Sequence, residues 1–105
     1  MCGRYTLRVT PAELAEIFET IRIPDFPPRY NITPTSAHDR NDPDPHKHIV
    51  AIKAGREAAL MNWGIIPPWE RGSKALINAC GETVATRRSF KGAFQARRCL
   101  IPADG

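Results

Sequence analysis

The spacing of apolar residues predicts one amphipathic helix close to the N-terminus. Four apolar side chains recur at i, i+3, i+4 and i+7, the interval that places them on one helix face: Leu14, Ile17, Phe18 and Ile21. The preceding Thr10-Pro11-Ala12-Glu13 has the sequence of a capping box, with Pro at the first helical position. We therefore predict a helix over residues 11–20 that packs this apolar face inward.

Three further apolar patterns predict strands in the first two thirds of the chain. Residues 3–9 alternate loosely between apolar and polar side chains, as a short strand does. The runs 48–53 and 58–63 flank a polar segment that contains Gly55. Two such runs separated by a short turn are typical of a β-hairpin.

The last third of the chain is expected to hold two strands and one helix. The apolar segment 75–79 predicts a buried strand that ends at Asn78, and residues 98–102 predict a final apolar strand. Between them, Ser89 is a suitable cap for a helix over residues 90–96.

Proline and polar residues predict that the intervening segments are not helical. Residues 29–35 are expected to be extended, since Pro34 holds the residue before it out of the helical region. Residues 36–47, rich in Asp, Asn and Pro, predict a solvated loop. Residues 63–69 form an aromatic loop that two consecutive prolines make rigid.

Composition limits the classes of protein that this chain can belong to. Its 105 residues are enough for one domain, and 42% hydrophobic with 25% charged residues is typical of a globular protein. No apolar run approaches the roughly 18 residues of a membrane span, and the first residues lack the charged start and apolar run of a signal peptide. Three widely spaced cysteines favour a reducing cytoplasm over a disulfide framework.

Basic charge is concentrated near the C-terminal end. The net charge is +4, and five cations fall within twelve residues that contain no acid: Arg87, Arg88, Lys91, Arg97 and Arg98. Such a segment permits an anionic partner without requiring one, because a basic helix face is often simply solvated.

The start of the chain carries the most specific chemistry. Met1 is usually removed when the second residue is as small as Cys2, and the mature chain would then begin with an α-amine and a thiol on one residue. Their ordinary pKa values, about 8 and about 8.5, leave some free amine and some thiolate near neutral pH. An aldehyde can form a Schiff base with this amine, and the thiolate can then close a thiazolidine ring. The alternative is that Cys2 is an ordinary residue at a frayed terminus.

Five ordered segments give the chain a family resemblance. They are Met-Cys-Gly-Arg-Tyr at 1–5, Arg-Tyr-Asn-Ile-Thr-Pro-Thr at 29–35, Asn-Trp-Gly-Ile-Ile-Pro-Pro-Trp at 62–69, Ile-Asn-Ala-Cys-Gly-Glu-Thr at 77–83 and Arg-Arg-Cys-Leu-Ile-Pro-Ala-Asp-Gly at 97–105. Together they resemble the SOS response-associated peptidase (SRAP) family of abasic-site processing proteins. The resemblance implies an α+β fold of strongly bent, barrel-like antiparallel sheets with peripheral helices. Residues 1–105 would be the N-terminal portion of one such domain, without its C-terminal part.

The resemblance also implies an activity, a partner and a set of site residues. Members bind single-stranded DNA that carries an abasic site, and their N-terminal Cys crosslinks to the ring-opened sugar and shields the lesion; no cofactor is involved. Cys2 would be the nucleophile and Asn78 would hold the opened sugar. The DNA contacts implied by the family pattern are Arg4, Asn31, Pro34, Trp69 and Arg88. Trp63, by contrast, is expected to be a core residue.

Two departures from the family pattern affect this reading. Position 80 is Cys where the family usually has a phosphate-binding Arg. The family's catalytic Glu and His follow the matched segments and have no counterpart in residues 1–105, so whether this chain is itself a lyase or peptidase stays open. His38, His46 and His48 do not match that His. We expect Glu82 to make a structural hydrogen bond or ion pair, and Cys80 and Cys99 to be inert thiols.

Other functions and states stay open on the sequence. The chain could be a non-catalytic single-strand-binding or structural remnant, or a thiol autopeptidase. A metal site is not expected, because the sequence contains no C-x-x-C or H-x₃₋₅-H pair. We expect a cytoplasmic protein, nucleoid-associated if bacterial, that is monomeric as a complete domain and prone to self-association as residues 1–105 alone.

Overall fold

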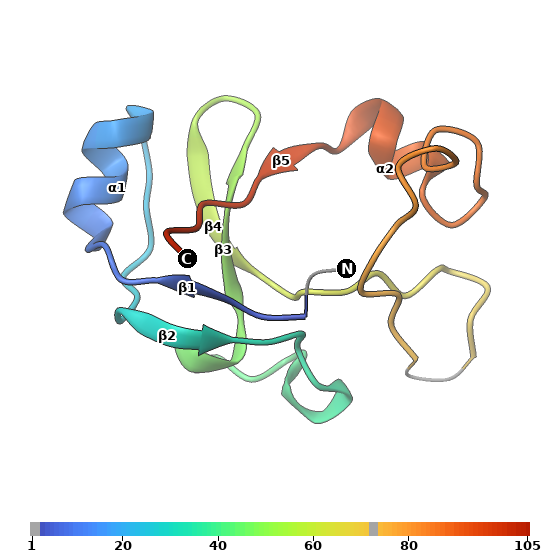
Figure 1. Ribbon diagram of the computed structural model, residues 1–105, viewed down its shortest axis with the longest axis horizontal. Coiled ribbons are helices and arrows are strands. Elements are labelled where there is room, and N and C mark those ends of the chain that lie inside the picture. The colour runs from blue at the N-terminus through green and yellow to red at the C-terminus, as the bar shows by residue number, and fades with distance from the viewer. Residues whose placement is uncertain (1–2, 72–73) are drawn as a thin grey trace.

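The computed structural model describes residues 3–71 and 74–105. Within these residues the chain forms two small antiparallel sheets with two short helices at the periphery (Figure 1). In chain order the elements are β1 (Tyr5–Leu7), α1 (Pro11–Phe18), β2 (Arg29–Ile32), β3 (Ile49–Lys53), β4 (Glu57–Met61), α2 (Lys91–Ala96) and β5 (Cys99–Leu100). The predicted α+β class is confirmed, and no closed barrel forms in the described part of the chain.

β3 is the central strand of the larger sheet. It pairs with β4 from Ile49↔Met61 to Lys53↔Glu57 and with β5 on its other edge, so the strand order is β4-β3-β5. Its first four residues are all buried. The predicted hairpin is therefore confirmed, and its turn is tight because Gly55 (φ 82°) and Arg56 (φ 59°) both adopt the left-handed conformation.

The core lies where α1, the β1–β2 pair and β3 meet. Its buried side chains include Leu7, Leu14, Phe26, Ile32, Ile49, Val50 and Ile52. Leu14 is the most fully enclosed of the large side chains. Complete burial of one such side chain contributes roughly 1.5–3 kcal/mol, a large share of the stability of a small domain.

The structure corrects the predicted inward face of α1. The capping box of Thr10 and Glu13 forms as predicted. The helix ends at Phe18, however, because Glu19 adopts the left-handed conformation. Ile21 then leaves the helical path, and its backbone N–H bonds to the carbonyl of Arg56 (2.8 Å). Ile17 and Ile21 are 64% and 72% exposed, so Leu14 and part of Phe18 form the packed face.

Two predictions for the last third of the chain are wrong. Residues 75–79 form no strand, only a single bridge between Ile65 and Leu76. The ladder does not extend because its next two positions on the Ile65 side are not available: the Trp63 N–H and carbonyl bond to Thr35, and Pro67 has no backbone N–H. Ser89 does not cap α2: Phe90 occupies the cap position without a side-chain bond. The Arg87 carbonyl accepts from the backbone N–H groups of residues 90 and 91 and forms the turn that precedes the helix.

The other sequence predictions agree with the structure at the level of element type. The predicted strands at 3–9 and 98–102 appear as the shorter β1 and β5, and residues 29–35 contain β2. The polar loop 36–47 contains only two short 3₁₀ turns, Ala37–Asp39 and Pro45–Lys47. Neither α1 nor α2 has the length and apolar content that crossing a bilayer requires.

β1 has a second neighbour besides β2, the segment 103–105. Thr6 donates its backbone N–H to the carbonyl of Gly105, and the N–H of Asp104 bonds back to the carbonyl of Thr6, both at 3.0 Å. The Asp104 carboxylate accepts from the Thr6 hydroxyl and from the Arg8 backbone N–H, both at 2.6 Å. These bonds, the Thr6 hydroxyl first, hold the pKa of Asp104 below its ordinary value. These bonds form a seam between β1 and residues 103–105, and the seam fixes β1 in place.

We predict that Asp104→Asn lowers the melting temperature at neutral pH. A carboxylate whose folded pKa is depressed stabilises the fold above its unfolded pKa of 3.8 and loses that contribution as the pH falls through the folded value. The difference between wild type and variant should therefore shrink as the pH is lowered below about 4.

Thermal unfolding followed by circular dichroism at pH 7 and pH 3 measures this effect. Asp25→Asn, at an exposed position outside the seam, is the matched control and should leave the melting temperature unchanged at pH 7. A pH-independent difference between wild type and Asp104→Asn would contradict the assignment.

Candidate functional site

One cleft of about 650 Å³ is lined by residues from both ends of the chain and from the hairpin between them. β1 contributes Tyr5, and Arg4 directly precedes it. The hairpin contributes the end of β4 and residues 62–65, and the opposite wall comes from residues 77–78 and from the segment that contains β5. Among the described lining residues there is no Asp or Glu, whereas Arg4, Arg97, Asn62 and Asn78 supply two cations and two amides. The cleft thus combines apolar side chains with two cations and is suited to an anionic ligand.

Trp63 links the segments that surround this cleft. Its indole N–H donates to the carbonyl of Ile77 (3.0 Å), the residue before Asn78. Its ring packs against Tyr5, with ring centroids 5.8 Å apart and planes tilted by 56°, a favourable geometry for an aromatic pair. Trp63 therefore ties the segment of Arg4 to the segment of Asn78. It also packs against the core as predicted, but its polar contacts give it a wider role.

The backbone of Trp63 also fixes the segment that follows β2. Its N–H donates to the Thr35 hydroxyl (2.8 Å), and its carbonyl accepts from the Thr35 N–H (3.2 Å). Thr35 is buried, with 8% of its surface exposed. A buried donor without a partner costs about 1–3 kcal/mol, so this reciprocal pair holds residues 33–35 against the cleft wall.

Gly64 permits the close approach of the cleft's two walls. Its φ of 129° lies in the region that favours glycine, and a Cβ there would lie 2.8 Å from the Cβ of Ala75. Arg40 donates from Nη2 to the Gly64 carbonyl (3.1 Å) and so satisfies the backbone at this bend. Any side chain at position 64 would push the two walls apart.

The structure brings some of the predicted site residues together and leaves others apart. Arg4 and Asn78 line the same cleft. Asn31 is exposed on β2, and Pro34 borders a separate hollow of about 200 Å³ with Arg29 and Lys47. Neither of these two residues lines the main cleft. Cys2 lies outside the described residues.

Trp69 and Arg88, far apart in the sequence, form a contact of their own. The Arg88 guanidinium lies over the Trp69 ring, 3.9 Å from its centroid, while the Trp69 side chain is 44% exposed. Such a cation–π contact contributes roughly 0.5–1 kcal/mol at an exposed site. The two residues that the family pattern assigns to stacking and to a phosphate are thus adjacent on the surface.

Sequence reasoning missed two of the polar residues that line the cleft, Arg97 and Asn62. Asn62 directly precedes Trp63, so its place in the Asn-Trp-Gly segment was a usable signal. Arg97 stood in the basic run without being distinguished from its neighbours. The alternation of side chains between the two faces of the final extended segment was a usable signal, because it predicts that Arg97 and Arg98 lie on opposite faces.

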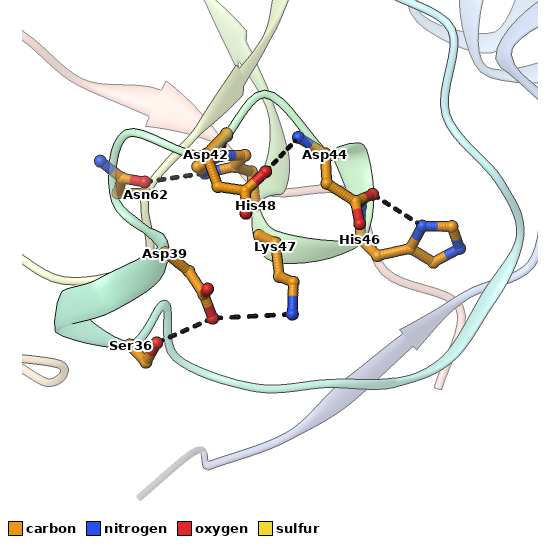
Figure 2. Close-up of polar contacts among 8 residues, drawn as sticks. All are labelled: Ser36, Asp39, Asp42, Asp44, His46, Lys47, His48 and Asn62. Carbon is orange, nitrogen blue, oxygen red and sulfur yellow. Dashed lines mark hydrogen bonds and ion pairs between the residues drawn. The ribbon is translucent and has the colours of Figure 1, made fainter.

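The polar loop 36–47 is held together by its own side chains (Figure 2). Asp39 accepts from the Ser36 hydroxyl (2.8 Å) and lies 3.9 Å from the Lys47 ammonium. The Asp44 carboxylate accepts from the backbone N–H of His46 and contacts its Nδ1, both at 2.9 Å. These bonds, the backbone one first, lower the pKa of Asp44. The acids and cations of the loop therefore satisfy one another.

His48 connects this loop to the cleft wall. Its Nδ1 lies 2.7 Å from Oδ1 of Asn62, a contact that Figure 2 shows. Its Nε2 contacts the carbonyl oxygen of Asp42. Arg29 in turn donates to the His48 carbonyl. His48 thus acts as a structural link that orients Asn62. Within residues 3–71 and 74–105, no cluster of His, Cys, Asp and Glu could hold a metal ion.

Tyr5 and Glu82 show how local contacts set the charge near the cleft. Burial raises the pKa of Tyr5 to about 12, although the Arg29 charge acts in the opposite direction, so the phenol stays neutral. Glu82 accepts a hydrogen bond from the Cys80 thiol (2.8 Å), which lowers the pKa of the carboxyl. The predicted structural hydrogen bond of Glu82 is therefore confirmed. Its partner is Cys80, which stands where the family pattern usually has Arg.

Comparison with known proteins places the chain in a family. The model of the SOS response associated peptidase (SRAP) family matches residues 1–105. The chain belongs to the SRAP family. It is 33% identical over 115 residues to the abasic site processing protein YoqW of Bacillus subtilis and 36% identical over 112 residues to YedK of Escherichia coli, an abasic site processing protein by name. These alignments cover 99% and 100% of this chain and 46% of each relative.

More distant SRAP relatives and a solved structure agree with the assignment. The abasic site processing protein HMCES of Pongo abelii is 31% identical over 100 residues, with 80% of this chain and 26% of that protein covered. A crystal structure of a Bordetella bronchiseptica protein matches 98% of this chain and 48% of its own, with a TM-score of 0.70 and 25% identity. The chain spans about half the length of the curated relatives it matches.

We predict that Thr35→Val destabilises the fold by about 1–3 kcal/mol, because the near-isosteric side chain leaves the Trp63 N–H without its acceptor. Thr35→Ser keeps the hydroxyl and should lose less. Thr33→Val, two residues away at an exposed position, is the matched control and should be close to neutral. Chemical denaturation gives the free energies, and equal stability of Thr35→Val and Thr33→Val would show that the bond does not support this segment.

Proposed function

We propose that this chain processes abasic sites in single-stranded DNA by forming a covalent bond through Cys2. The family and the names of its relatives support abasic sites as the substrate class. A net charge of +4 favours a polyanionic partner. The observation that carries the proposal is the cleft itself, in which Arg4 and Asn78 share a lining without Asp or Glu among the described residues; Cys2 is two residues before Arg4 in the sequence.

The proposed reaction needs no group beyond the chain and its substrate. After Met1 is removed, the α-amine of Cys2 attacks the aldehyde carbon of the ring-opened sugar, and one water leaves as the imine forms. The Cys2 thiolate then adds to the imine carbon, and the nitrogen takes up a proton. The product is a thiazolidine in which carbon, nitrogen and sulfur form one five-membered ring. No electrons are gained or lost overall.

The composition of the cleft matches a sugar that has lost its base. Such a site offers no base edge, so affinity must come from phosphates, apolar contact and strand shape. In this proposal Arg4 binds a backbone phosphate beside the lesion, and the Asn78 amide holds a hydroxyl of the opened sugar. Asn31 and Pro34 contact the strand farther from the reacting carbon, consistent with their place outside the cleft lining.

Trp69 and Arg88 supply a second contact surface in this scheme. The exposed Trp69 ring offers a face on which a base can stack, which is worth roughly 1–3 kcal/mol and is independent of sequence. Arg88 covers one face of that ring, so in this proposal a base stacks on the other face and the Arg88 charge lies next to the stacked nucleotide. The surface therefore favours a single strand, whose bases are free to stack.

The test of this function is covalent capture. Mature wild-type chain incubated with a single-stranded oligonucleotide containing one abasic site should give a heat-resistant adduct on a denaturing gel. Cys2→Ala should give none. Cys2→Ala and Cys2→Ser both keep the α-amine, so each should leave only a weaker, reversible imine that borohydride can trap.

Two controls define the result. Cys99→Ala removes another thiol from the cleft lining and should leave the yield of adduct unchanged. The same oligonucleotide with an intact base should not react with any variant. An adduct yield from Cys2→Ala equal to that of wild type would refute the role of Cys2.

We further propose that residues 1–105 are the N-terminal portion of a single larger SRAP domain. Several apolar side chains along the cleft are substantially exposed: Met61, Ile65, Ile77 and Ile101, between 39% and 45%. Contiguous exposed apolar surface favours association. A complete domain would cover part of this apolar surface and be monomeric.

Residues 1–105 alone are therefore expected to self-associate through the part of this apolar surface that a complete domain would cover. Ile101→Glu should shift the sedimentation profile toward monomer, because it places a charge on the apolar wall. Ile17→Glu is the matched control on the exposed side of α1 and should not change the profile. A monodisperse wild-type monomer at high concentration, with sharp cooperative unfolding, would overturn this proposal.

A further inference from the structure

The end of α2 and the strand after it direct two adjacent arginines to different surfaces. Arg97 is the cap residue of α2: its N–H bonds to the carbonyl of Ala93 (2.8 Å), and its φ and ψ of −132° and 55° lead the chain out of the helix. The chain from there to its last residue then contributes every second residue to the cleft lining: Arg97, Cys99, Ile101, Ala103 and Gly105. This is the alternation of an extended segment, in which successive side chains point to opposite faces.

Arg98 belongs to the opposite face of that segment. Its guanidinium lies over the Phe94 ring, 4.5 Å from the centroid. Arg98 and Leu100 line a separate hollow of about 510 Å³ next to the hairpin turn, together with Lys53 and Arg56. The two neighbours carry the same charge and are both exposed, yet Arg98 does not line the main cleft.

We propose that Arg97 binds a phosphate that flanks the base-free sugar in the main cleft. This inference rests on the proposed function, and it adds to that function a DNA contact on the β5 side of the cleft. Arg4 enters the cleft from the segment before β1, so the two guanidinium groups come from different parts of the fold. An abasic sugar has a phosphate on each side, and each arginine takes one of them.

The charges around Arg97 favour an anionic ligand. In the part of the chain that the structure describes, no Asp or Glu lines the cleft and no ion pair involves Arg97. Arg8 and Arg56, by contrast, lie 3.5 and 3.9 Å from acidic oxygens. A guanidinium that has no internal counterion and borders an apolar cleft keeps its donors available for a phosphate, which it can bind in a bidentate manner.

The size and polarity of the cleft fit a sugar-phosphate unit. Its volume of about 650 Å³ lies within the usual range for ligand sites. Tyr5, Ile77 and Ile101 line it with apolar surface against which the carbon skeleton of a deoxyribose can pack. The arginines and asparagines then meet the phosphates and hydroxyls.

The experiment measures DNA binding without the covalent step. The probe is a single-stranded oligonucleotide with a tetrahydrofuran in place of the abasic sugar, which has no aldehyde and cannot react with Cys2. Affinity is measured by fluorescence anisotropy between low and physiological salt. Each phosphate contact contributes roughly −0.7 to the slope of log affinity against log salt.

Arg97→Gln should flatten this slope by roughly 0.7, because one phosphate contact is lost. Arg97→Lys keeps the charge and should restore the slope, with weaker binding because the bidentate geometry is absent. Arg98→Gln removes the same charge one residue away and should change the slope by less than half as much. Circular dichroism checks that the variants keep the wild-type fold.

The results separate this inference from the proposed function. If Arg97→Gln and Arg98→Gln change the slope equally, Arg97 has no special contact and the inference fails, even when wild type forms its Cys2 adduct on a natural abasic site. If wild type binds the tetrahydrofuran strand with the predicted arginine dependence but forms no Cys2 adduct, the covalent function fails and the Arg97 contact stands. No binding of any strand by wild type would overturn both.

Discussion

The hydrogen bonds and ring contact of Trp63 are the constraint on which the cleft depends. The residue joins three segments that are distant in sequence: Tyr5 through its ring, Thr35 through its backbone and Ile77 through its indole N–H. A side chain that was merely apolar would fill the same space but would leave the Ile77 carbonyl without this donor. The position of Asn78 therefore follows from an aromatic residue that carries a polar group, a common use of tryptophan at partly buried sites.

This arrangement also explains why the cleft can be both apolar and selective for charge. Trp63 and its partners hold the cleft walls together. The two cations of the lining, Arg4 and Arg97, are therefore not needed for that purpose. The acids of this region are used elsewhere: Asp39 and Asp44 bond within the polar loop, and Asp104 bonds along β1. Guanidinium groups that border the cleft thus face no internal competitor for an anionic ligand.

Local sequence patterns predicted the elements whose hydrogen bonds are local. The capping box of Thr10 and Glu13 and the hairpin around Gly55 could be read directly, because each depends on residues a few positions apart. The strand at 75–79 could not be excluded in this way, since the backbone of Trp63, which would continue the pairing, bonds to the distant Thr35 instead. The sequence pattern predicted too long an inward face for α1, because the helix ends where Glu19 adopts the left-handed conformation. A glycine at that position would have indicated such an end, whereas Glu does not.

The site could be predicted only in part, because some of its contacts depend on the tertiary fold. The family pattern indicated Arg4 and Asn78, which share the cleft, but it gave no basis for separating Arg97 from Arg98. That distinction depends on where α2 ends and on which face of the final extended segment each residue occupies. The contact between Arg88 and Trp69 likewise joins residues that only the tertiary fold brings together.

The pairing of Thr6 with Asp104 has a consequence for the order of events during folding. The two residues are 98 positions apart, so the bond closes a loop that is almost the whole chain. The entropy of closing such a loop costs roughly 4 kcal/mol beyond a constant, and contacts of this separation form late in folding. During synthesis, β1 can pair with β2 once residue 32 has left the ribosome, but its bonds to residues 103–105 cannot form until those residues have emerged. Removal of Met1 can therefore precede the closure of the seam.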